Sequence, residues 1–304
     1  MNVLLEPFDF AFFRHGLVVA TLAGALCGLL GVYVTLRGMS YIGHGLSHAI
    51  FGGAAASAVV SVNFYLGAGL WGLASALAIG RITRRRLIGA DAAIGVVTTA
   101  SFALGLALLN RFGQVRKSLD AALFGSILGV SATDVWLVAA VTVLAVVVVV
   151  AGYRPLLFTT FDPEVAEVSG VRTARVDAVL MALLAVAILA TMKVLGVVLI
   201  AATLVIPAVI ARMLTNSFAR MLWMSTAIGA ACGFVGMNAS YHLDISSGAA
   251  IVLVGATAFG VVFATTGARG RRRAHGVPDH HGPASSPLRE PLGPGTILGL
   301  KEVV

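Results

Sequence analysis

RGMSYIGHGLSHAIFGG, residues 37–53, is the stretch from which the organisation of this chain can be worked out. It follows an apolar block at 17–36 and runs into the next one, at 41–61; a helix needs about 20 apolar residues to cross a membrane. His44 and His48 stand four residues apart, about one helical turn, so both imidazoles should lie on one face. Ionisable side chains at bilayer depth are costly, and this pair is therefore a candidate functional site.

The whole chain has the composition of an integral membrane protein. Of its 304 residues, 59% are hydrophobic and 11% are charged, against about 25% charged in soluble domains. The fold predicted is all-α and polytopic, with about nine spans, at 17–36, 41–61, 64–80, 92–109, 135–151, 176–192, 194–211, 221–239 and 248–266. Residues 121–130 are too short to span and are predicted to form a re-entrant half-helix.

Charge placement predicts the domains and the orientation. Residues 1–266 should form a transmembrane domain, and the basic, then Pro-, Gly-, Ser- and His-rich residues 267–304 a disordered cytoplasmic tail. With the N-terminus outside, sixteen of the 21 Lys and Arg residues fall on the cytoplasmic side, as the positive-inside rule favours. The arginines lack interleaved aromatic residues, which argues against nucleic acid as a partner.

The longest polar internal loop is predicted at residues 152–175, and it contains FDPEVAEVSGV. Asp162 is a good N-cap, Pro163 suits the first helical position, Glu164 falls in the first turn, and Gly170 can end the helix. These residues predict a helix of about two turns in a cytoplasmic loop. Such a helix is either a docking element or a capped loop helix without a partner.

Two other features are weaker candidates. Pro207 should kink the span at 194–211, as a packing feature or as a hinge. His242 and Asp244 lie on the outer turn before the last span, where they could form an extracellular entrance or simply a polar turn. The sequence contains no GxxxxGK[ST] motif and no HExxH motif, so we expect a protein that is not itself an enzyme.

Five blocks in this order carry a family resemblance: RGMSYIGHGLSHAIFGG, LFGSILGV, FDPEVAEVSGV, MKVLGVVLIAATLVIPAVIAR and YHLDISSGAAIVLVGATAFG. Together they resemble the permease subunits of bacterial metal ABC importers, the family that imports zinc, manganese or iron(II). The resemblance extends over residues 10–266, nearly the whole hydrophobic chain, and leaves out the tail.

This resemblance implies a multi-pass permease in the bacterial cell membrane, working with three kinds of partner. A second permease protomer, in a homodimer or alternatively a heterodimer, would complete the pathway. A separate cytoplasmic subunit would bind ATP, and an extracytoplasmic metal-binding protein would deliver the ion. The segment FDPEVAEVSGV would be the ATPase-coupling helix, because Glu164, Ala166 and Gly170 are similar to the E-x-A-x3-G pattern of ABC importer permeases. No cofactor is expected to be bound permanently.

The histidine motif departs from the family pattern at one position. The family commonly has GDALSH where this chain has GHGLSH, so His48 corresponds to the family histidine and His44 stands where an aspartate is usual. Two imidazoles suit Zn²⁺ better than Mn²⁺, which favours oxygen ligands. We therefore predict zinc as the transported metal, with manganese or iron(II) as the alternative. The alternative is a purely structural role, in which the histidines hydrogen-bond to backbone or to Ser47.

Other transport and enzyme classes fit less well. An ATP-independent secondary metal carrier would need ionisable coupling residues at mid-membrane, yet the spans are nearly free of carboxylates. An intramembrane enzyme would need a nucleophile and base, or a metal and base, at one depth, and the sequence offers no such set. A vitamin B12 or siderophore permease would call for a wider pathway with fewer histidines.

Overall fold

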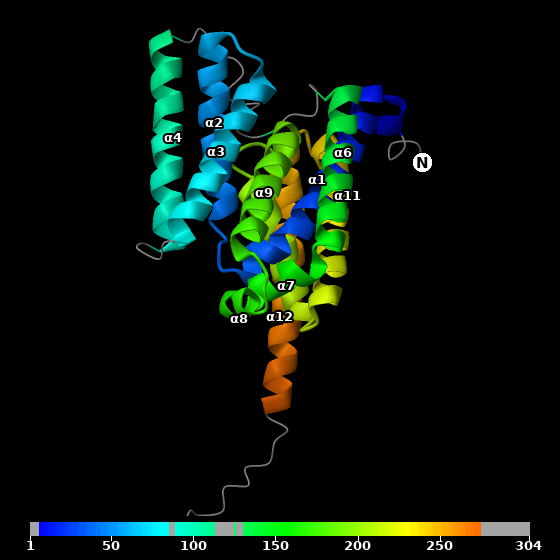
Figure 1. Cartoon of the computed structure of the whole chain (residues 1–304). Helices are drawn as coiled ribbons and strands as arrows, with labels where there is room; N and C mark the ends of the chain where they lie inside the picture. Colours follow the sequence, from blue (N-terminus) through cyan, green and yellow to red (C-terminus); the bar gives the residue numbers. More distant parts are fainter. Residues whose placement is uncertain (1–5, 85–88, 113–124, 126–129, 275–304) are drawn as a thin grey trace, which may run out of the picture. The chain divides into compact units, whose positions relative to one another are not determined.

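The computed structural model describes residues 6–84, 89–112, 125 and 130–274 (Figure 1). All the regular elements in those residues are helical, which confirms the predicted fold class. They are η1 (Glu6–Asp9), α1 (Ala11–Leu36), α2 (Ile42–Val60), α3 (Phe64–Arg84), α4 (Ala90–Phe112), α6 (Ala132–Ala151), α7 (Tyr153–Phe161), α8 (Pro163–Val168), α9 (Thr173–Leu195), α10 (Ile200–Leu214), α11 (Phe218–Leu243) and α12 (Ser247–Ala274).

Seven helices of the described part are long and apolar enough to cross a membrane: α1, α3, α4, α6, α9, α11 and α12. The other two predicted spans correspond to α2 and to α10, which has 15 residues. The predicted span 194–211 starts too early, because Gly196 adopts a φ of 76° and ends α9, so α10 begins only at Ile200. Most of the predicted half-helix at 121–130 lies outside the described residues.

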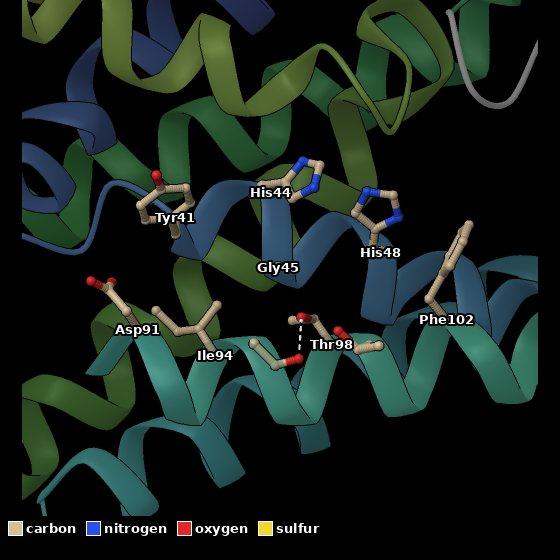
Figure 2. Close-up of a pocket in the computed structure, with 10 residues that line it drawn as sticks. Tyr41, His44, Gly45, His48, Asp91, Ile94, Thr98 and Phe102 are labelled. Atoms are coloured by element: carbon tan, nitrogen blue, oxygen red, sulfur yellow. Dashed lines mark hydrogen bonds between the residues drawn. The ribbon is translucent and has the colours of Figure 1, made fainter. Parts of the chain in front are cut away.

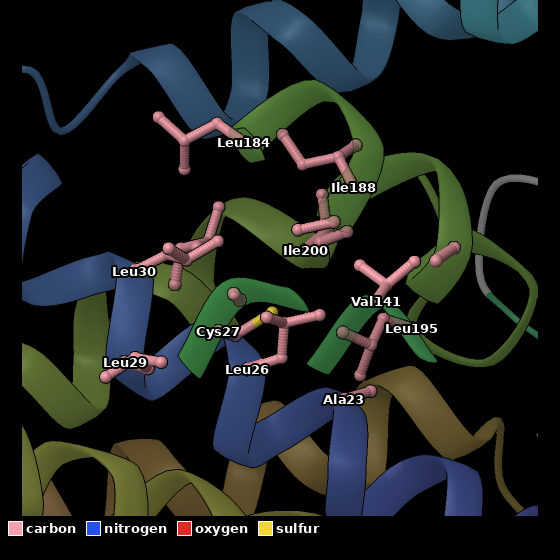
Figure 3. Packing of buried hydrophobic residues seen from close by; sticks show 14 of the residues in the cluster. Ala23, Leu26, Cys27, Leu29, Leu30, Val141, Leu184, Ile188, Leu195 and Ile200 are labelled. Carbon is pink, nitrogen blue, oxygen red and sulfur yellow. The ribbon is translucent and has the colours of Figure 1, made fainter. Parts of the chain in front are cut away.

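The core is built around α1. Its apolar side chains meet those of the neighbouring helices in one buried cluster, which includes Leu30, Leu184 and Ile200 (Figure 3). On another side of α1, Gly24 lies against the backbone of Gly229 in α11, and a Cβ at either position would collide with the carbonyl group of the other. Glycines therefore permit the close approach of α1 and α11, as small residues do in membrane helix pairs.

Helices α2, α3 and α4 stand side by side in the structure (Figure 1). Helix α2 approaches α4 closely, because a Cβ at Gly52 would collide with the backbone carbonyl of Ser101. The serine side chains of α2 face inward as well: Ser47 donates a hydrogen bond of 2.8 Å to the carbonyl of Val197, in the turn between α9 and α10. These contacts set the orientation of the α2 face that carries the two histidines.

The prediction of a polar loop over residues 152–175 is wrong for its first part, which forms α7. Thr159 and Thr160 are buried there, and each hydroxyl donates a hydrogen bond to a backbone carbonyl one turn back in the same helix. Such hydrogen bonding within the helix allows a polar side chain to be buried. The polar residues of this segment therefore did not indicate a loop.

The predicted short helix in the same segment is confirmed as α8. The Asp162 side chain accepts a hydrogen bond of 2.9 Å from the amide of Val165, and Pro163 occupies the first turn. Gly170 adopts a φ of +82° shortly after the helix ends.

The chain divides into two compact units, Met1–Thr266 and Gly267–Val304. The first contains the membrane helices described above. The second corresponds to the predicted cytoplasmic tail. The prediction of disorder is wrong for residues 267–274, which are helical as the end of α12, whereas residues 275–304 lie outside the described part and the location of the tail stays a prediction.

Candidate functional site

His44 and His48 lie in the first two turns of α2, on one face of the helix (Figure 2). Their ring centroids are 4.3 Å apart and the ring planes are inclined by 73°. His44 is exposed and His48 is half-buried. The ring of His48 also packs edge-on against Phe102 of α4, at 4.6 Å between centroids. The phenyl ring therefore supports the second histidine from the neighbouring helix.

The hydrogen bonds near the pair do not occupy the imidazoles. Ser47 donates to the backbone carbonyls of His44 and Val197, at 2.9 and 2.8 Å, so its proton is directed away from both rings. Nδ1 of His48 is buried and has no hydrogen-bond partner among the described residues. A buried nitrogen without a partner is unfavourable unless something else binds it. The alternative interpretation, in which His48 is hydrogen-bonded to the backbone or to Ser47, therefore has no such bond to support it at Nδ1.

A cavity of about 320 Å³ lies between α2 and α4 and contains both imidazoles. It is lined by Tyr41, His44, Gly45, His48, Asp91, Ile94, Gly95, Thr98, Thr99 and Phe102 (Figure 2). Gly45 faces Ile94 and Thr98, and a Cβ there would press on both side chains. The glycines of α2 thus bring α4 close enough to supply the second wall.

The cavity adds polar groups from α4 that sequence reasoning missed. Asp91 in the first turn of α4 is exposed, and its carboxylate borders the cavity that holds the histidines. Thr98 and Thr99 contribute hydroxyls. The one available signal was a single acid next to a span, which sequence reasoning interprets as an interfacial residue. Only the packing of α2 on α4 puts it in the same cavity as the histidines.

One chain does not complete a metal site in this arrangement. The described residues contain no group of three or more His, Cys, Asp or Glu side chains close enough to hold one ion together. His44 and His48 form a close pair, and Asp91 lies elsewhere along the same cavity. The cavity can therefore receive a cation through two nitrogens and a more distant carboxylate, which suits passage better than permanent binding.

The other predicted site residues lie away from this cavity. In α8, Ala166 is buried, whereas Val165 and Val168 are 53% and 91% exposed. An exposed apolar pair on a helix of six residues is suited to docking against a partner. Glu164 is also exposed.

At the end of α11, the exposed His242 packs against Tyr241, and Asp244 adopts a left-handed conformation that ends the helix. Asp244 therefore has a structural role in the turn, and the entrance role of both residues stays a prediction. Pro207 is buried inside α10, where a proline cannot donate the usual helical hydrogen bond. A hinge at this position is untested.

Comparison with known proteins decides the family. The model of the ABC 3 transport family matches residues 9–266, which is most of the chain. The chain belongs to the ABC 3 transport family. The predicted resemblance to the permease subunits of metal ABC importers is thereby confirmed, and with it the expectation that this chain is a membrane permease rather than an enzyme.

Individual relatives of this ABC 3 family chain agree in length and fold. The Manganese transport system membrane protein MntC of Halalkalibacterium halodurans is 34% identical, over 84% of this chain and 87% of the relative. The "Probable iron transport system membrane protein" of Haemophilus influenzae is 34% identical, over 86% of this chain and 96% of its own length. Among solved structures, PsaBC from Streptococcus pneumoniae in complex with Fab is similar with a TM-score of 0.77 and 32% identity, over 85% of this chain and 95% of that one.

Proposed function

We propose that this chain is the membrane-spanning subunit of an ATP-driven importer that carries manganese or iron(II) into the cytoplasm. The observation that carries the proposal is the cavity between α2 and α4, which His44, His48 and, farther along it, Asp91 all line in a permease of the ABC 3 family. Relatives over most of the length are described as manganese and iron transport proteins.

This choice of metal replaces the zinc preference drawn from the sequence. That preference depended on His44, which removes the carboxylate that the family usually has beside its histidine. The carboxylate of Asp91 borders the same cavity and offers an oxygen donor from α4 instead. Mn²⁺ favours oxygen ligands and Fe²⁺ accepts a mixture of nitrogen and oxygen, so this donor set no longer favours zinc.

A second protomer is part of the proposal. Two imidazoles alone are too few for stable coordination, and the carboxylate of Asp91 does not lie close enough to them to complete a site within the described residues of one chain. His44 is exposed on α2, and a copy of the same chain facing it would double the number of donors. A homodimer therefore accounts for a cavity that is incomplete in the monomer.

The other partners are assigned from charge and exposure. The exposed valines of α8 would dock into a cytoplasmic ATP-binding subunit, with Asp162, Pro163 and Gly170 shaping the helix. The count of basic residues supports an orientation with the N-terminus outside and the tail inside. On the opposite side, His242 and Asp244 would receive an extracytoplasmic metal-binding protein, and Pro207 would allow α10 to bend as the pathway opens and closes.

Metal uptake in vesicles tests the assignment. Vesicles carry the chain with its ATP-binding subunit, the metal-loaded binding protein is supplied, and manganese entry is measured with and without ATP. We expect His44→Ala and His48→Ala to lose most of the uptake, whereas the matched control His15→Ala, on α1, keeps it. Normal uptake by both cavity variants would remove His44 and His48 from the pathway. Uptake by the wild type without ATP would refute the importer.

A further inference from the structure

Arg37 directly follows α1 and is held by three side chains from two other helices. Its Nη1 lies 2.6 Å from Oδ1 of Asp177 in α9, and its side chain is only 10% exposed. Its Nη2 donates to Thr159 at 2.9 Å and its Nε to Thr160 at 3.2 Å, both in α7. All three kinds of guanidinium nitrogen are therefore engaged, each with a different acceptor.

The directions of these hydrogen bonds are set by α7 itself. Thr159 donates its only hydroxyl proton to the carbonyl of Pro155 at 2.9 Å, and Thr160 donates to that of Leu156 at 2.6 Å. Each hydroxyl oxygen is left to accept, and a guanidinium can only donate. The planar fork of arginine matches acceptors in fixed positions, which the single ammonium of lysine cannot do.

Helix α7 continues into α8 without an intervening loop. Asp162 alone separates them: its amide donates to the carbonyl of Phe158 in α7 at 2.9 Å, and its own carbonyl accepts from Ala166 in α8 at 3.0 Å. Pro163, the first residue of α8, lines the same cavity as Arg37 and Asp177. A movement of α8 is therefore passed to α7 and to the threonines that hold Arg37.

On its other side, Arg37 is tied to the start of α2. The amide of Met39 donates to Val34 at 3.0 Å across Gly38, which adopts a φ of +66°, and the amide of Ile42 donates to Met39 at 2.9 Å. Met39 is buried. The connection between α1 and α2 is thus hydrogen-bonded from end to end, and His44 follows two residues after Ile42.

We propose that Arg37 is a positioning residue that transmits the movement of α8 to α2 and so links ATP hydrolysis to the metal cavity. The inference rests on the proposed function, because it requires an ATP-binding subunit docked on α8. A partly buried ion pair adds little to net stability but can fix how two elements sit against each other. Here the pair joins the segment that would receive the force to the helix that carries the histidines.

The same region provides two control positions. Arg84 of α3 lies 3.8 Å from the other oxygen of Asp177 and is more exposed, so it neighbours the ion pair without bonding to α7. Lys193 pairs with Asp134 at 2.8 Å, but it lies near the end of α9, whereas Asp177 lies near the beginning. The Lys193–Asp134 pair lies outside the chain of contacts from α8 to α2, whereas Arg84 shares Asp177 with Arg37 and controls for loss of a second, longer contact to that carboxylate.

The test uses the complete importer in vesicles and measures metal imported per ATP hydrolysed. The first variant is Arg37→Lys, which keeps the positive charge but loses the planar guanidinium group. The second is the double change Thr159→Val with Thr160→Val, which removes the two hydroxyl acceptors of α7 but keeps the ion pair with Asp177. Both should assemble with the ATP-binding subunit and retain basal ATP hydrolysis, while the metal imported per ATP falls about tenfold, within the usual range of coupling between sites. Arg84→Gln and Lys193→Gln should keep the wild-type ratio.

The outcomes separate the two proposals. If the wild type imports metal and both the Arg37 and threonine variants keep its ratio, the positioning role is wrong and the proposed function stands. If the variants fail to assemble or lose basal hydrolysis along with uptake, Arg37 is only a structural residue. A wild-type complex that imports no metal refutes the proposed function, and the role of Arg37 in coupling is refuted with it.

Discussion

Replacing Gly52 by alanine should destabilise the protein, although alanine is the better helix former. A Cβ at this position would lie 2.9 Å from the carbonyl carbon of Ser101 and closer still to its oxygen. Ordinary contacts of this kind are about 3.4–4 Å, so α2 and α4 would have to separate by several tenths of an ångström or more. The obstacle is backbone, which cannot rotate away as a side chain can.

The size of the effect follows from two opposing terms. Overpacking of a tight contact costs about 1–3 kcal/mol. The gain in helix propensity from Gly to Ala returns about 0.5–1 kcal/mol. We therefore expect a net loss of up to about 2.5 kcal/mol, with about 1 kcal/mol at the centre of the range. Gly95 provides the matched control, because it lies on α4 in the same cavity and a Cβ there meets no atom within 4 Å. Gly95→Ala should be neutral or slightly stabilising.

Thermal unfolding in detergent measures both variants, and manganese uptake in vesicles measures the consequence for the site. Gly52→Ala should lower the midpoint by a few degrees, on the scale of about 2–4 °C per kcal/mol. Uptake should fall as well, because Phe102, which follows Ser101, packs on the ring of His48 at 4.6 Å. Equal and same-signed shifts for Gly52→Ala and Gly95→Ala would refute the close approach of α2 and α4 as the reason for the glycine.

Three further predictions concern the metal and the docking helix. His44→Asp restores the usual family acid and should raise the ratio of manganese to zinc uptake in competition assays; an unchanged ratio would mean that residue 44 does not contact the ion. Asp91→Asn should lower manganese uptake by about tenfold, the scale of one lost contact to a charged group, and leave folding unchanged; full uptake would exclude this carboxylate from the pathway. Val168→Glu puts a charge on the more exposed of the two valines of α8 and should weaken binding of the ATP-binding subunit by about fivefold or more in pull-down titrations, whereas the uncharged Val168→Thr is expected to bind nearly as well as the wild type.

Features that depend on neighbouring residues were predictable. The caps of α8 come from Asp162 and Pro163 acting on amides within one turn, so they could be located before the fold was known. The spacing of His44 and His48 determines that they share a face of a helix in any tertiary context. The apolar blocks identified the membrane helices for the same reason, since length and composition are local properties.

Predictions failed where a residue's partner is distant in the sequence. The buried threonines of α7 look polar in isolation, but each satisfies its hydroxyl within the helix, and both then accept from Arg37, more than 120 residues earlier. The turn at Gly196 interrupts a continuous apolar run, so hydrophobicity alone could not locate it. The zinc preference was drawn without Asp91, because nothing near His44 in the sequence indicates that α4 will line the same cavity.

The sequence by itself therefore determined the membrane class, the family and the histidine face of α2, because these depend on composition, order and helical periodicity. Only the tertiary structure decided what that face meets. Glycines at positions 45 and 52 allow α4 to approach. This approach packs Phe102 against His48 and puts Asp91 on the wall of the same cavity. Contacts between helices depend on shape complementarity over long sequence separations, which no local pattern encodes.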